Sequence, residues 1–531
     1  MTATTTTAMK TPSGVPRVPG LDPADQDLVA GLMGQLSRKA GRNRVRRDYY
    51  DLRQRLKDLG ISLPKKLREV DIALGWPAKG VDELVKRTSL DGFTHPEADV
   101  ADLGVADVWE SNHLETQVPQ ALVESAICSV AFCSLTAGDT EAGEPEALWS
   151  FRSGEFATGT WDPRVYGLRN ALTVYETDNT GGVVDFALYV PDRVVWCRRQ
   201  GRSWDVREVR HELGVPVEPL VYRQRLQRPF GSSRISRAVM YLTDAGIRTA
   251  LRSEVSYEYF SAPQRYALGV TEDAFQDEDG NWQEAAFESI IGRILALTRD
   301  ENGDLPEVGS FPQITAEPNM AALRTITQLL AAELNMPVSA FGIVQDNPAS
   351  AEAIHAVKED MVIDAVNWQR SLGPALCRQM GRALAMRDAS PEALAAYRKL
   401  KAHWVDPSTP SVVSLADAFS KQAAVIPGLA ETEVGLELSG MTRDQIVRYM
   451  DERRRARGAA LVGALDAAQS AAEQAGAVKA KVDVFTALLA AGVARDSAAA
   501  QAGLAGLQWA DSGPAASAAS AAPAAPVGGG V

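Results

Sequence analysis

Residues 316–388 constrain the fold most, because they contain two helical patterns separated by a short loop that proline and glycine mark. The first pattern predicts a helix over residues 317–335, with an apolar residue at every third or fourth position. It ends before Pro337, because the residue that precedes a proline is disfavoured in helical geometry. The second pattern predicts a much longer helix over residues 351–388. Two such helices joined by a short loop are typical of a mechanical element and not of a catalytic pocket.

The residues that we expect to matter lie on both helices and in the loop between them. On the first helix they are Met320, Leu323, Arg324, Ile326 and Leu330. In the loop, residues 336–350, they are Ile343, Val344, Gln345, Asp346, Asn347 and Pro348. In the second helix, Gly373 and Pro374 interrupt the apolar stripe. This pair predicts a kink, because proline removes a backbone donor and crowds the preceding turn.

The rest of the chain predicts several packed regions, since 531 residues exceed the ~250–300 that one core supports. Residues 1–25 are rich in threonine and proline, which predicts a disordered arm. An apolar run over residues 108–135 predicts a helix, and alternating segments with turn residues predict β-structure over 147–221. From residue 458 the chain is rich in alanine, and residues 513–531 are of low complexity and predicted to be unstructured.

Charged residues are concentrated in three parts of the sequence, of which two are basic and one is acidic. The predicted helix over residues 27–58 carries many arginines, and so does one side of a later helix. The arginines of the later helix are Arg234, Arg237, Arg248 and Arg252. We interpret them as salt-bridged surface residues, with ligand contacts as the alternative. Two acidic turns within residues 270–312 contain Asp277, Asp279, Asp300, Glu301 and Asp304, and the second turn predicts a hairpin.

The sequence lacks the known signatures of catalysis and metal binding. There is no phosphate-binding P-loop and no nucleophile elbow. His211 and Glu212 begin a zinc-protease pattern but lack its second histidine, and neither acidic turn has the ligand spacing of a calcium loop. The sequence therefore predicts no cofactor, no metal and no catalytic residues of a standard kind. A site built from dispersed residues stays open.

Charge and hydropathy limit the partners further. The formal net charge is −13, with 68 acidic and 55 basic residues, which argues against a broad basic face that grips nucleic acid. It is compatible with a channel through which DNA slides. No stretch approaches the ~20 apolar residues of a membrane span, so we expect no membrane contact. The first ten residues lack an apolar core, and the four cysteines are too scattered for a disulfide framework, so we expect reduced thiols in a cytoplasmic protein.

Three blocks of sequence resemble the portal proteins of tailed double-stranded-DNA phages, and most closely the branch found in phages of actinobacteria. Residues 330–362, LAAELNMPVSAFGIVQDNPASAEAIHAVKEDMV, resemble the helix, tunnel loop and long helix of these proteins. Residues 228–269 resemble the helix upstream of the stem, and residues 58–87 resemble the start of the wing domain. The order of the blocks makes the resemblance specific.

The resemblance implies an α+β, mainly helical portal fold with wing, stem, clip and crown. The implied divisions are a wing over 26–270, stem and clip over 271–316, a stem helix over 317–335, a tunnel loop over 336–350, a long kinked helix over 351–388, a crown over 389–457 and a tail over 458–531. It implies a ring, usually of twelve copies, that forms a DNA channel at one capsid vertex for packaging and ejection.

The resemblance also implies partners and roles for residues. The clip would dock the large terminase and later the head–tail adaptor, and the ring would meet the major capsid and scaffolding proteins. Duplex DNA would pass without sequence specificity. Gln345, Asp346 and Asn347 would offer weak contacts to its phosphates, although the loop is also explained as an ordinary connection.

Some alternatives remain open. In the crown, Arg453, Arg454 and Arg455 would meet DNA, or they mark an exposed helix end. The charged helix over residues 27–58 would present a solvated face, or it would contact packaged DNA or a capsid protein. Two other functions also remain: a different virion head-joining protein, or a DNA-processing enzyme with a non-standard site. The resemblance places the protein in the virion, and in the host cytoplasm during assembly.

Overall fold

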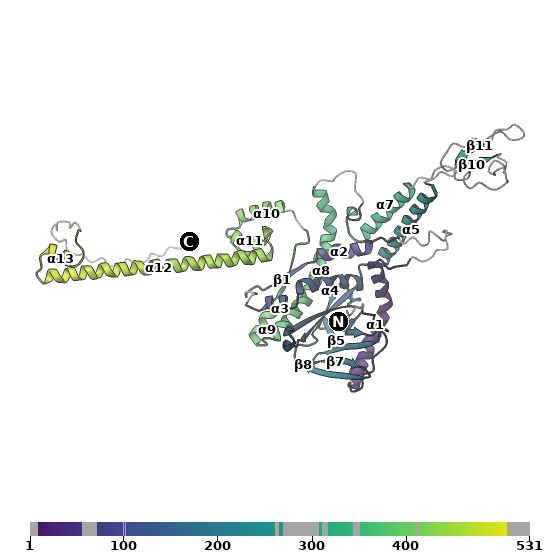
Figure 1. Ribbon diagram of the computed structural model, residues 1–531, viewed down its shortest axis with the longest axis horizontal. Coiled ribbons are helices and arrows are strands. Elements are labelled where there is room, and N and C mark those ends of the chain that lie inside the picture. Colours follow the sequence, from purple (N-terminus) through teal and green to yellow (C-terminus); the bar gives the residue numbers. More distant parts are fainter. Residues whose placement is uncertain are drawn as a thin grey trace, which may run out of the picture. The chain divides into compact units, whose positions relative to one another are not determined.

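A computed structural model describes residues 9–55, 72–98, 100, 102–260, 265–268, 307–310, 317–342, 351–408 and 412–506. The chain divides into two compact units, Met1–Thr409 and Pro410–Val531 (Figure 1). Helices and antiparallel sheets together confirm the predicted α+β, mainly helical class. None of the helices in the described ranges has the length and apolar character needed to cross a membrane.

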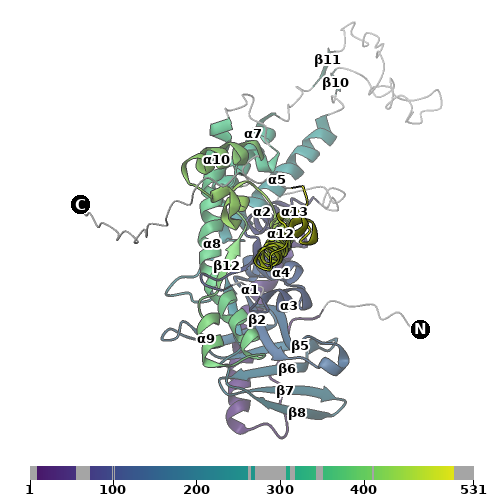
Figure 2. The same cartoon turned by 90° about the vertical axis from the view of Figure 1, so that its left-hand side faces the viewer.

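Helices dominate the first unit by length. They are α1 (Pro23–Tyr50), α2 (Trp76–Lys86), α3 (Val105–Ser111), α4 (Leu114–Cys128), α5 (Arg237–Phe260), α7 (Glu317–Glu333), α8 (Ala351–Ala385) and α9 (Pro391–Tyr397), with short 3-10 turns η2 (Thr140–Ala142) and η4 (Val338–Phe341). Helices α5 and α7 lie side by side and extend away from the sheets (Figures 1 and 2).

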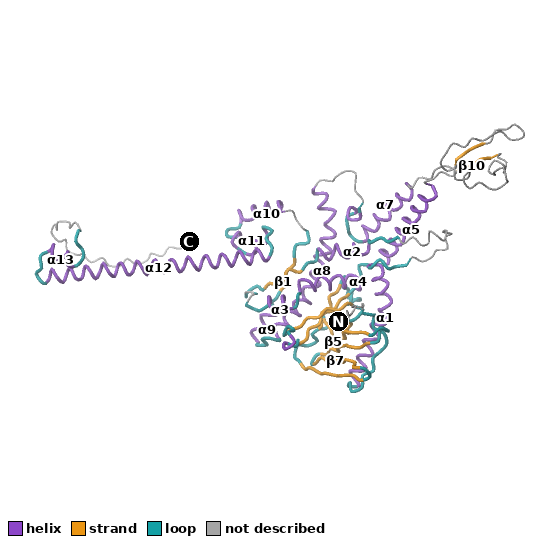
Figure 3. The backbone as a smooth tube through the Cα atoms, in the orientation of Figure 1, coloured by secondary structure: helices purple, strands orange, loops and turns teal. Residues whose placement is uncertain are grey.

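Within the described residues, the strands of the first unit form four antiparallel sheets (Figure 3). They are β1 (Leu90–Thr94), β2 (Val130–Ala137), β3 (Ala147–Ser153), β4 (Ala157–Asp162), β5 (Gly167–Thr177), β6 (Val183–Val190), β7 (Arg193–Gln200), β8 (Ser203–Arg210), β9 (Val217–Val221), β10 (Arg265–Leu268), β11 (Glu307–Ser310) and β12 (Lys401–Trp404). The orders are β4-β5-β6-β7-β8, β3-β2-β9, β1-β12 and β10-β11. The pairing of β1 with β12 joins the chain that follows α8 to the segment that follows α2.

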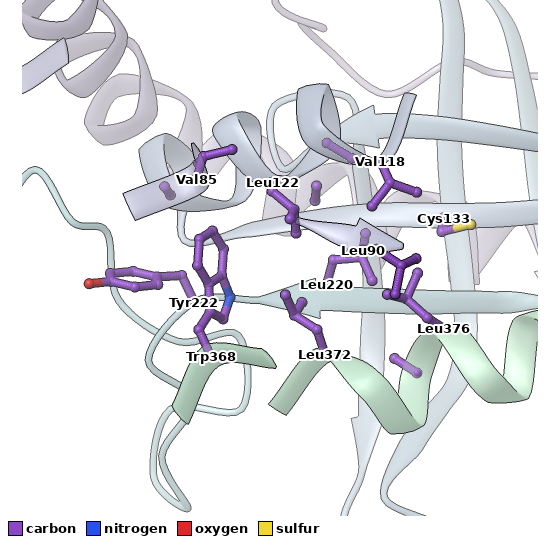
Figure 4. Packing of buried hydrophobic residues seen from close by; sticks show 14 of the residues in the cluster. Val85, Leu90, Val118, Leu122, Cys133, Leu220, Tyr222, Trp368, Leu372 and Leu376 are labelled. Carbon is purple, nitrogen blue, oxygen red and sulfur yellow. The ribbon is translucent and has the colours of Figure 1, made fainter. Parts of the chain in front are cut away.

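The main core lies where α8 and α4 cover the sheet β3-β2-β9 (Figure 4). Leu372 and Trp368 of α8 are buried beside Leu220 of β9. The indole of Trp368 donates from Nε1 to the carbonyl of Val221 over 2.9 Å, and its ring packs edge-on against Tyr222 with centroids 5.0 Å apart. One side of the long helix is thereby fixed to the sheet.

A buried carboxylate adds an ionic attachment between α8 and β9. Glu218 accepts two hydrogen bonds from Arg378, of 3.0 and 2.7 Å, and one of 2.7 Å from Arg382. The Glu218 side chain is 3% exposed, whereas those of Arg378 and Arg382 are 40% and 21% exposed. Two-point arginine–carboxylate contacts are directional as well as strong, so they set the rotation of α8 on the sheet.

The second unit is helical. It contains α10 (Val412–Val425), η5 (Leu429–Glu431), α11 (Glu433–Leu438), α12 (Arg443–Ala490) and α13 (Arg495–Gln501). Helix α12 begins with a capping box, in which Thr442 and Gln445 satisfy each other's backbone N–H groups. The helix runs through residue 458, where we predicted the change from crown to tail, because alanine has the highest helix propensity.

The structure corrects the predicted helix over residues 108–135. Helix α4 ends at Cys128, and residues 130–135 belong to strand β2, which pairs with β3 and β9. Residues 130–135 are buried throughout, so β2 shows no alternation of apolar and polar residues. Periodicity does not separate a fully buried strand from a helix, and that caused the error.

The N-terminal arm is also ordered where it is described. Ser13 donates its backbone N–H to the carbonyl of Gly181 over 2.8 Å, and Val18 is 4% exposed. The Asp22 carboxylate then caps α1 by accepting from the N–H of Ala24. The prediction of disorder over 1–25 is therefore wrong for residues 9–25, because pairing with the β5–β6 hairpin overrides composition. Residues 1–8 lie outside the described part.

Replacing Glu218 tests the attachment of α8. In Glu218→Gln, two arginines lose their shared counter-charge, so we expect the free energy of unfolding to fall by about 1–3 kcal/mol. Chemical denaturation followed by circular dichroism measures this loss. The control Glu83→Gln removes an exposed pair with Lys86 and is expected to change stability by less than about 0.5 kcal/mol. Equal effects of the two variants would contradict the assignment.

Candidate functional site at the junction of helices α7 and α8

Helix α7 ends in a complete backbone cap. The N–H of Met336 donates to the carbonyl of Ala331 over 2.9 Å, and the N–H of Asn335 donates to that of Ala332 over 3.2 Å. Asn335 has a φ of 50°, in the left-handed region that asparagine tolerates better than most residues. These two bonds form the Schellman motif that commonly ends helices. The chain therefore leaves α7 at a fixed residue and in a fixed direction.

A buried arginine, Arg234, joins the end of α7 to two other parts of the unit. Its Nε donates to the carbonyl of Gly80 in α2, and its Nη2 donates to that of Leu334 over 2.7 Å. Its Nη1 donates to the hydroxyl of Tyr222 over 2.8 Å. Arg234 is 3% exposed, so each lost bond would leave a polar group without water.

A carboxylate on α8, Asp364, completes the junction. Its Oδ2 accepts from Asn335 Nδ2 over 3.1 Å and from Arg223 Nη2 over 3.3 Å. The same oxygen lies 3.6 Å from Arg234 Nη1. One carboxylate therefore links the cap of α7 to the body of α8.

Close packing on α2 supports the same junction. A Cβ on Gly80 would lie 2.8 Å from Cδ1 of Leu334, so α2 reaches the end of α7 because it has glycine there. Beyond the cap, the ring of Phe341 packs edge-on against Trp76 with centroids 6.5 Å apart. The start of the connection between α7 and α8 is thus held by its cap and by packing, while residues 343–350 within it lie outside the described part.

The predicted stem-helix residues lie on α7, which packs against α5. Leu330 is fully buried, Leu323 and Ile326 are half-buried, and Met320 and Arg324 are exposed. The outer side of α7 therefore faces solvent in the single chain.

Several other predicted residues lie outside the described part of the chain. They are the loop residues Ile343, Val344, Gln345, Asp346, Asn347 and Pro348, and the residues of the acidic turns, Asp277, Asp279, Asp300, Glu301 and Asp304. Gly373 and Pro374 lie within α8, which continues through them as one helix. The kink and the roles of these residues stay predictions.

The predicted crown arginines lie on α12. Arg453 donates to the carboxylate and to the carbonyl of Glu431, and Arg454 lies 3.8 Å from Asp451. Arg455 is exposed. Their contact with DNA remains a prediction.

One cluster has the residue types of a metal site, but an arginine side chain binds its carboxylates. Oxygen and sulfur atoms of Glu124, Cys128 and Glu155 lie within 4.8 Å of one another. The Arg47 guanidinium bonds to both carboxylates, with Nη1 3.1 Å from Glu124 Oε1. Burial, followed by the nearby carboxylates, raises the pKa of the Cys128 thiol, so the thiol stays protonated. An arginine already provides the positive charge that such a cluster needs.

Two residues that hold this junction together, Arg234 and Asp364, were not predicted from the sequence. We interpreted Arg234 as a surface residue, which is wrong because it is buried and bonded to three separate segments of the chain. The sequence of α8 did contain a signal for Asp364. Asp364 follows Met361 by three residues and precedes Trp368 by four, so it lies near the apolar face and requires a partner.

Comparison with known proteins identifies the family. Residues 34–458 match the family model described as phage portal protein, SPP1 Gp6-like. The chain belongs to this family of phage portal proteins. The portal protein of Mycobacterium phage L5 is 27% identical over 430 residues, which cover 78% of this chain and 86% of the relative. That of Mycobacterium phage D29 is 26% identical over 431 residues, with the same shares covered.

A solved structure is also similar. It is the neck of an empty gene transfer agent particle, with a TM-score of 0.40 and 13% identity, covering 69% of this chain and 90% of that one. The family match and the two mycobacteriophage relatives confirm the portal-protein resemblance that the sequence blocks indicated.

Replacing Arg234 tests whether the junction holds the connection of this portal protein. In Arg234→Gln, at least two of three buried acceptors lose their donor, and we expect a stability loss of about 3–5 kcal/mol. Hydrogen exchange measures where the loss occurs. We expect faster exchange in residues 317–342 and 351–365 and little change in strands β5–β8.

The conservative variant Arg234→Lys provides the control. Lysine keeps the charge but lacks the planar fork, so it should restore only part of the protection. Uniformly faster exchange across the whole unit in both variants would contradict a local anchoring role.

Proposed function

We propose that the protein assembles into a closed ring of identical subunits, twelve by family resemblance, at one vertex of a phage capsid. The ring would form the channel for DNA packaging and ejection. Family membership over residues 34–458 carries this proposal. Head-to-tail contacts between identical subunits close into a ring when the rotation between neighbours divides a full turn.

In this ring, the exposed side of α7 would contribute to contacts around the channel. Met320 and Leu329 are 38% and 56% exposed, although both are apolar. Apolar side chains on the outer side of a helix suit burial against a neighbouring copy. Contact with a neighbouring copy would therefore explain why the predicted stem helix has apolar side chains on its exposed side.

The connection between α7 and α8 would act as the tunnel loop. Its base is held by the Asn335 cap and by the contacts of Arg234 and Asp364. A loop whose base is fixed can move beyond that base without disturbing the helix that precedes it. Residues 343–348 would then face the axis, where polar side chains give DNA weak, exchangeable contacts.

The portal itself would not hydrolyse nucleotide. A separate large terminase would dock at the clip within residues 271–316 and supply the energy, and a head–tail adaptor would later take its place. Major capsid and scaffolding proteins would surround the ring during assembly in the host cytoplasm. An ATPase and nuclease assay on the purified protein tests this division of labour, and turnover without terminase would contradict it.

The double variant Gln345→Lys/Asp346→Lys tests the tunnel loop. Lysines in every subunit would bind the passing phosphates and hold them, so we expect at least a tenfold lower yield of DNA-filled heads. Phage lacking its own portal gene, complemented with the variant, gives this yield by electron microscopy. Rings of the purified variant should form normally.

The matched control is Gln200→Lys/Asp205→Lys, which makes the same charge change on exposed residues of β7 and β8. A full yield of filled heads from the loop variant, or an equal loss in the control, would count against the loop's role.

A further inference from the structure

A basic hollow lies between α1 and the segment that precedes α5. It consists of two adjoining cavities of about 680 and 290 Å³. The arginines that line this basic hollow are Arg42, Arg46, Arg223, Arg225, Arg228 and Arg237. Arg42 and Arg46 come from one turn of α1, and the other four come from residues 223–237, far along the chain. The fold therefore concentrates positive charge in one place of an otherwise acidic protein.

A tight turn presents part of this charge. Arg225 and Arg228 exchange backbone hydrogen bonds of 3.2 and 2.8 Å, which brings the two ends of the turn together. Both side chains are exposed, and Arg225 donates to the hydroxyl of Ser232 over 3.2 Å. The turn is thus held by its own backbone while its guanidinium groups remain available.

Carboxylates do not neutralise most of this charge. Within the ranges that the structure describes, Arg223 is the one lining arginine with an ion pair, to Asp364 at 3.3 Å. In the same ranges, Arg42, Arg46, Arg228 and Arg237 have no carboxylate oxygen within 4 Å. Like charges gathered without counter-ions destabilise a fold, so such a cluster indicates a binding site for an anion.

The energetic cost of gathering these positive charges is clearest at Arg46. Its Nη1 is buried and has no hydrogen-bond partner among the described residues. Burial, followed by repulsion from Arg42 and Arg228, lowers the pKa of Arg46 to about 10. Burial and the neighbouring Arg42 also lower the pKa of Lys39, which lies 4.5 Å above the ring of Phe230 at the floor of the smaller cavity. An anion in the hollow would remove these penalties.

We propose that the basic hollow binds consecutive phosphate groups of a DNA backbone. One or two guanidinium groups satisfy a single phosphate, whereas four unpaired arginines on two segments fit several phosphates in a row. Most of the lining arginines are exposed, so the hollow is open to a long polymer. Arginine contacts of this kind recognise the backbone without reading the sequence.

The residues of this site are not those of the predicted tunnel loop, and the proposal does not require the ring to be a conduit. It gives the protein a second DNA contact that holds, in contrast to a loop that lets DNA slide. The sequence left three alternatives open for the charged face of helix α1, namely solvent, packaged DNA and a capsid protein, and the proposal favours DNA.

Binding of a labelled 20-base-pair duplex to the purified full-length protein tests the proposal. We expect Arg42→Gln/Arg228→Gln to weaken binding at least tenfold near 100 mM salt, measured by fluorescence anisotropy. The slope of log affinity against log salt should become less negative by about 1.8, since each lost phosphate contact removes about 0.9. The single variant Arg237→Gln, at an exposed position, should give a smaller loss and guards against misfolding of the double variant.

The matched control is Arg202→Gln/Arg207→Gln, which removes the same charge from exposed residues at the β7–β8 hairpin. It should leave the salt slope unchanged. An equal loss in both double variants would overturn the proposal, because net charge alone would then explain binding.

Two further arms identify the occupant. Tripolyphosphate that binds the protein more tightly than the 20-base-pair duplex does, measured by its competition with the labelled duplex, would overturn the DNA assignment in favour of a free anion. Unchanged DNA binding together with failed ring assembly in Arg42→Gln/Arg228→Gln would overturn it in favour of an acidic segment of a neighbouring copy. Normal rings with a selective loss of DNA binding would support it.

Discussion

The Arg234 guanidinium is the interaction on which the arrangement of α2, α7 and α8 depends. Its three nitrogen atoms donate to a carbonyl of α2, to the carbonyl of Leu334 just after α7 and to a tyrosine hydroxyl beside β9, and the Asp364 carboxylate lies next to it. A buried charge with each of its three nitrogen atoms bonded in a fixed direction specifies one geometry, because any shift of one helix breaks a bond that water does not replace. The cap at Asn335 then determines where the chain leaves this fixed point.

Much of this architecture was predictable from local patterns. The predicted helix over 317–335 is α7, Glu317–Glu333, and that over 351–388 is α8, Ala351–Ala385, because an apolar stripe and a following proline are encoded in a few adjacent residues. The strands within 147–221 were indicated by alternation for the same reason. The portal resemblance was confirmed by the family match.

Features set by distant partners were not predictable in this way. Strand β2 is covered on both faces, so its sequence has no alternating pattern. Residues 9–22 are ordered by a hairpin that lies far along the chain, and Arg234 is buried by three elements whose meeting no local pattern encodes. The basic hollow likewise requires α1 and the turn at Arg225 to come together, although the two segments lie far apart in the sequence.

The length of helix α12 sets the distance between its two ends. At about 1.5 Å per residue, its 48 residues span roughly 72 Å. Few of its described side chains are buried, with Ile446 and Phe485 the main exceptions, and alanine-rich sequence lets it persist as a helix without a packed core along its length. A partner bound near Thr442 is therefore held several nanometres from a partner bound near Ala490. Each residue inserted into α12 would increase that distance by the same amount.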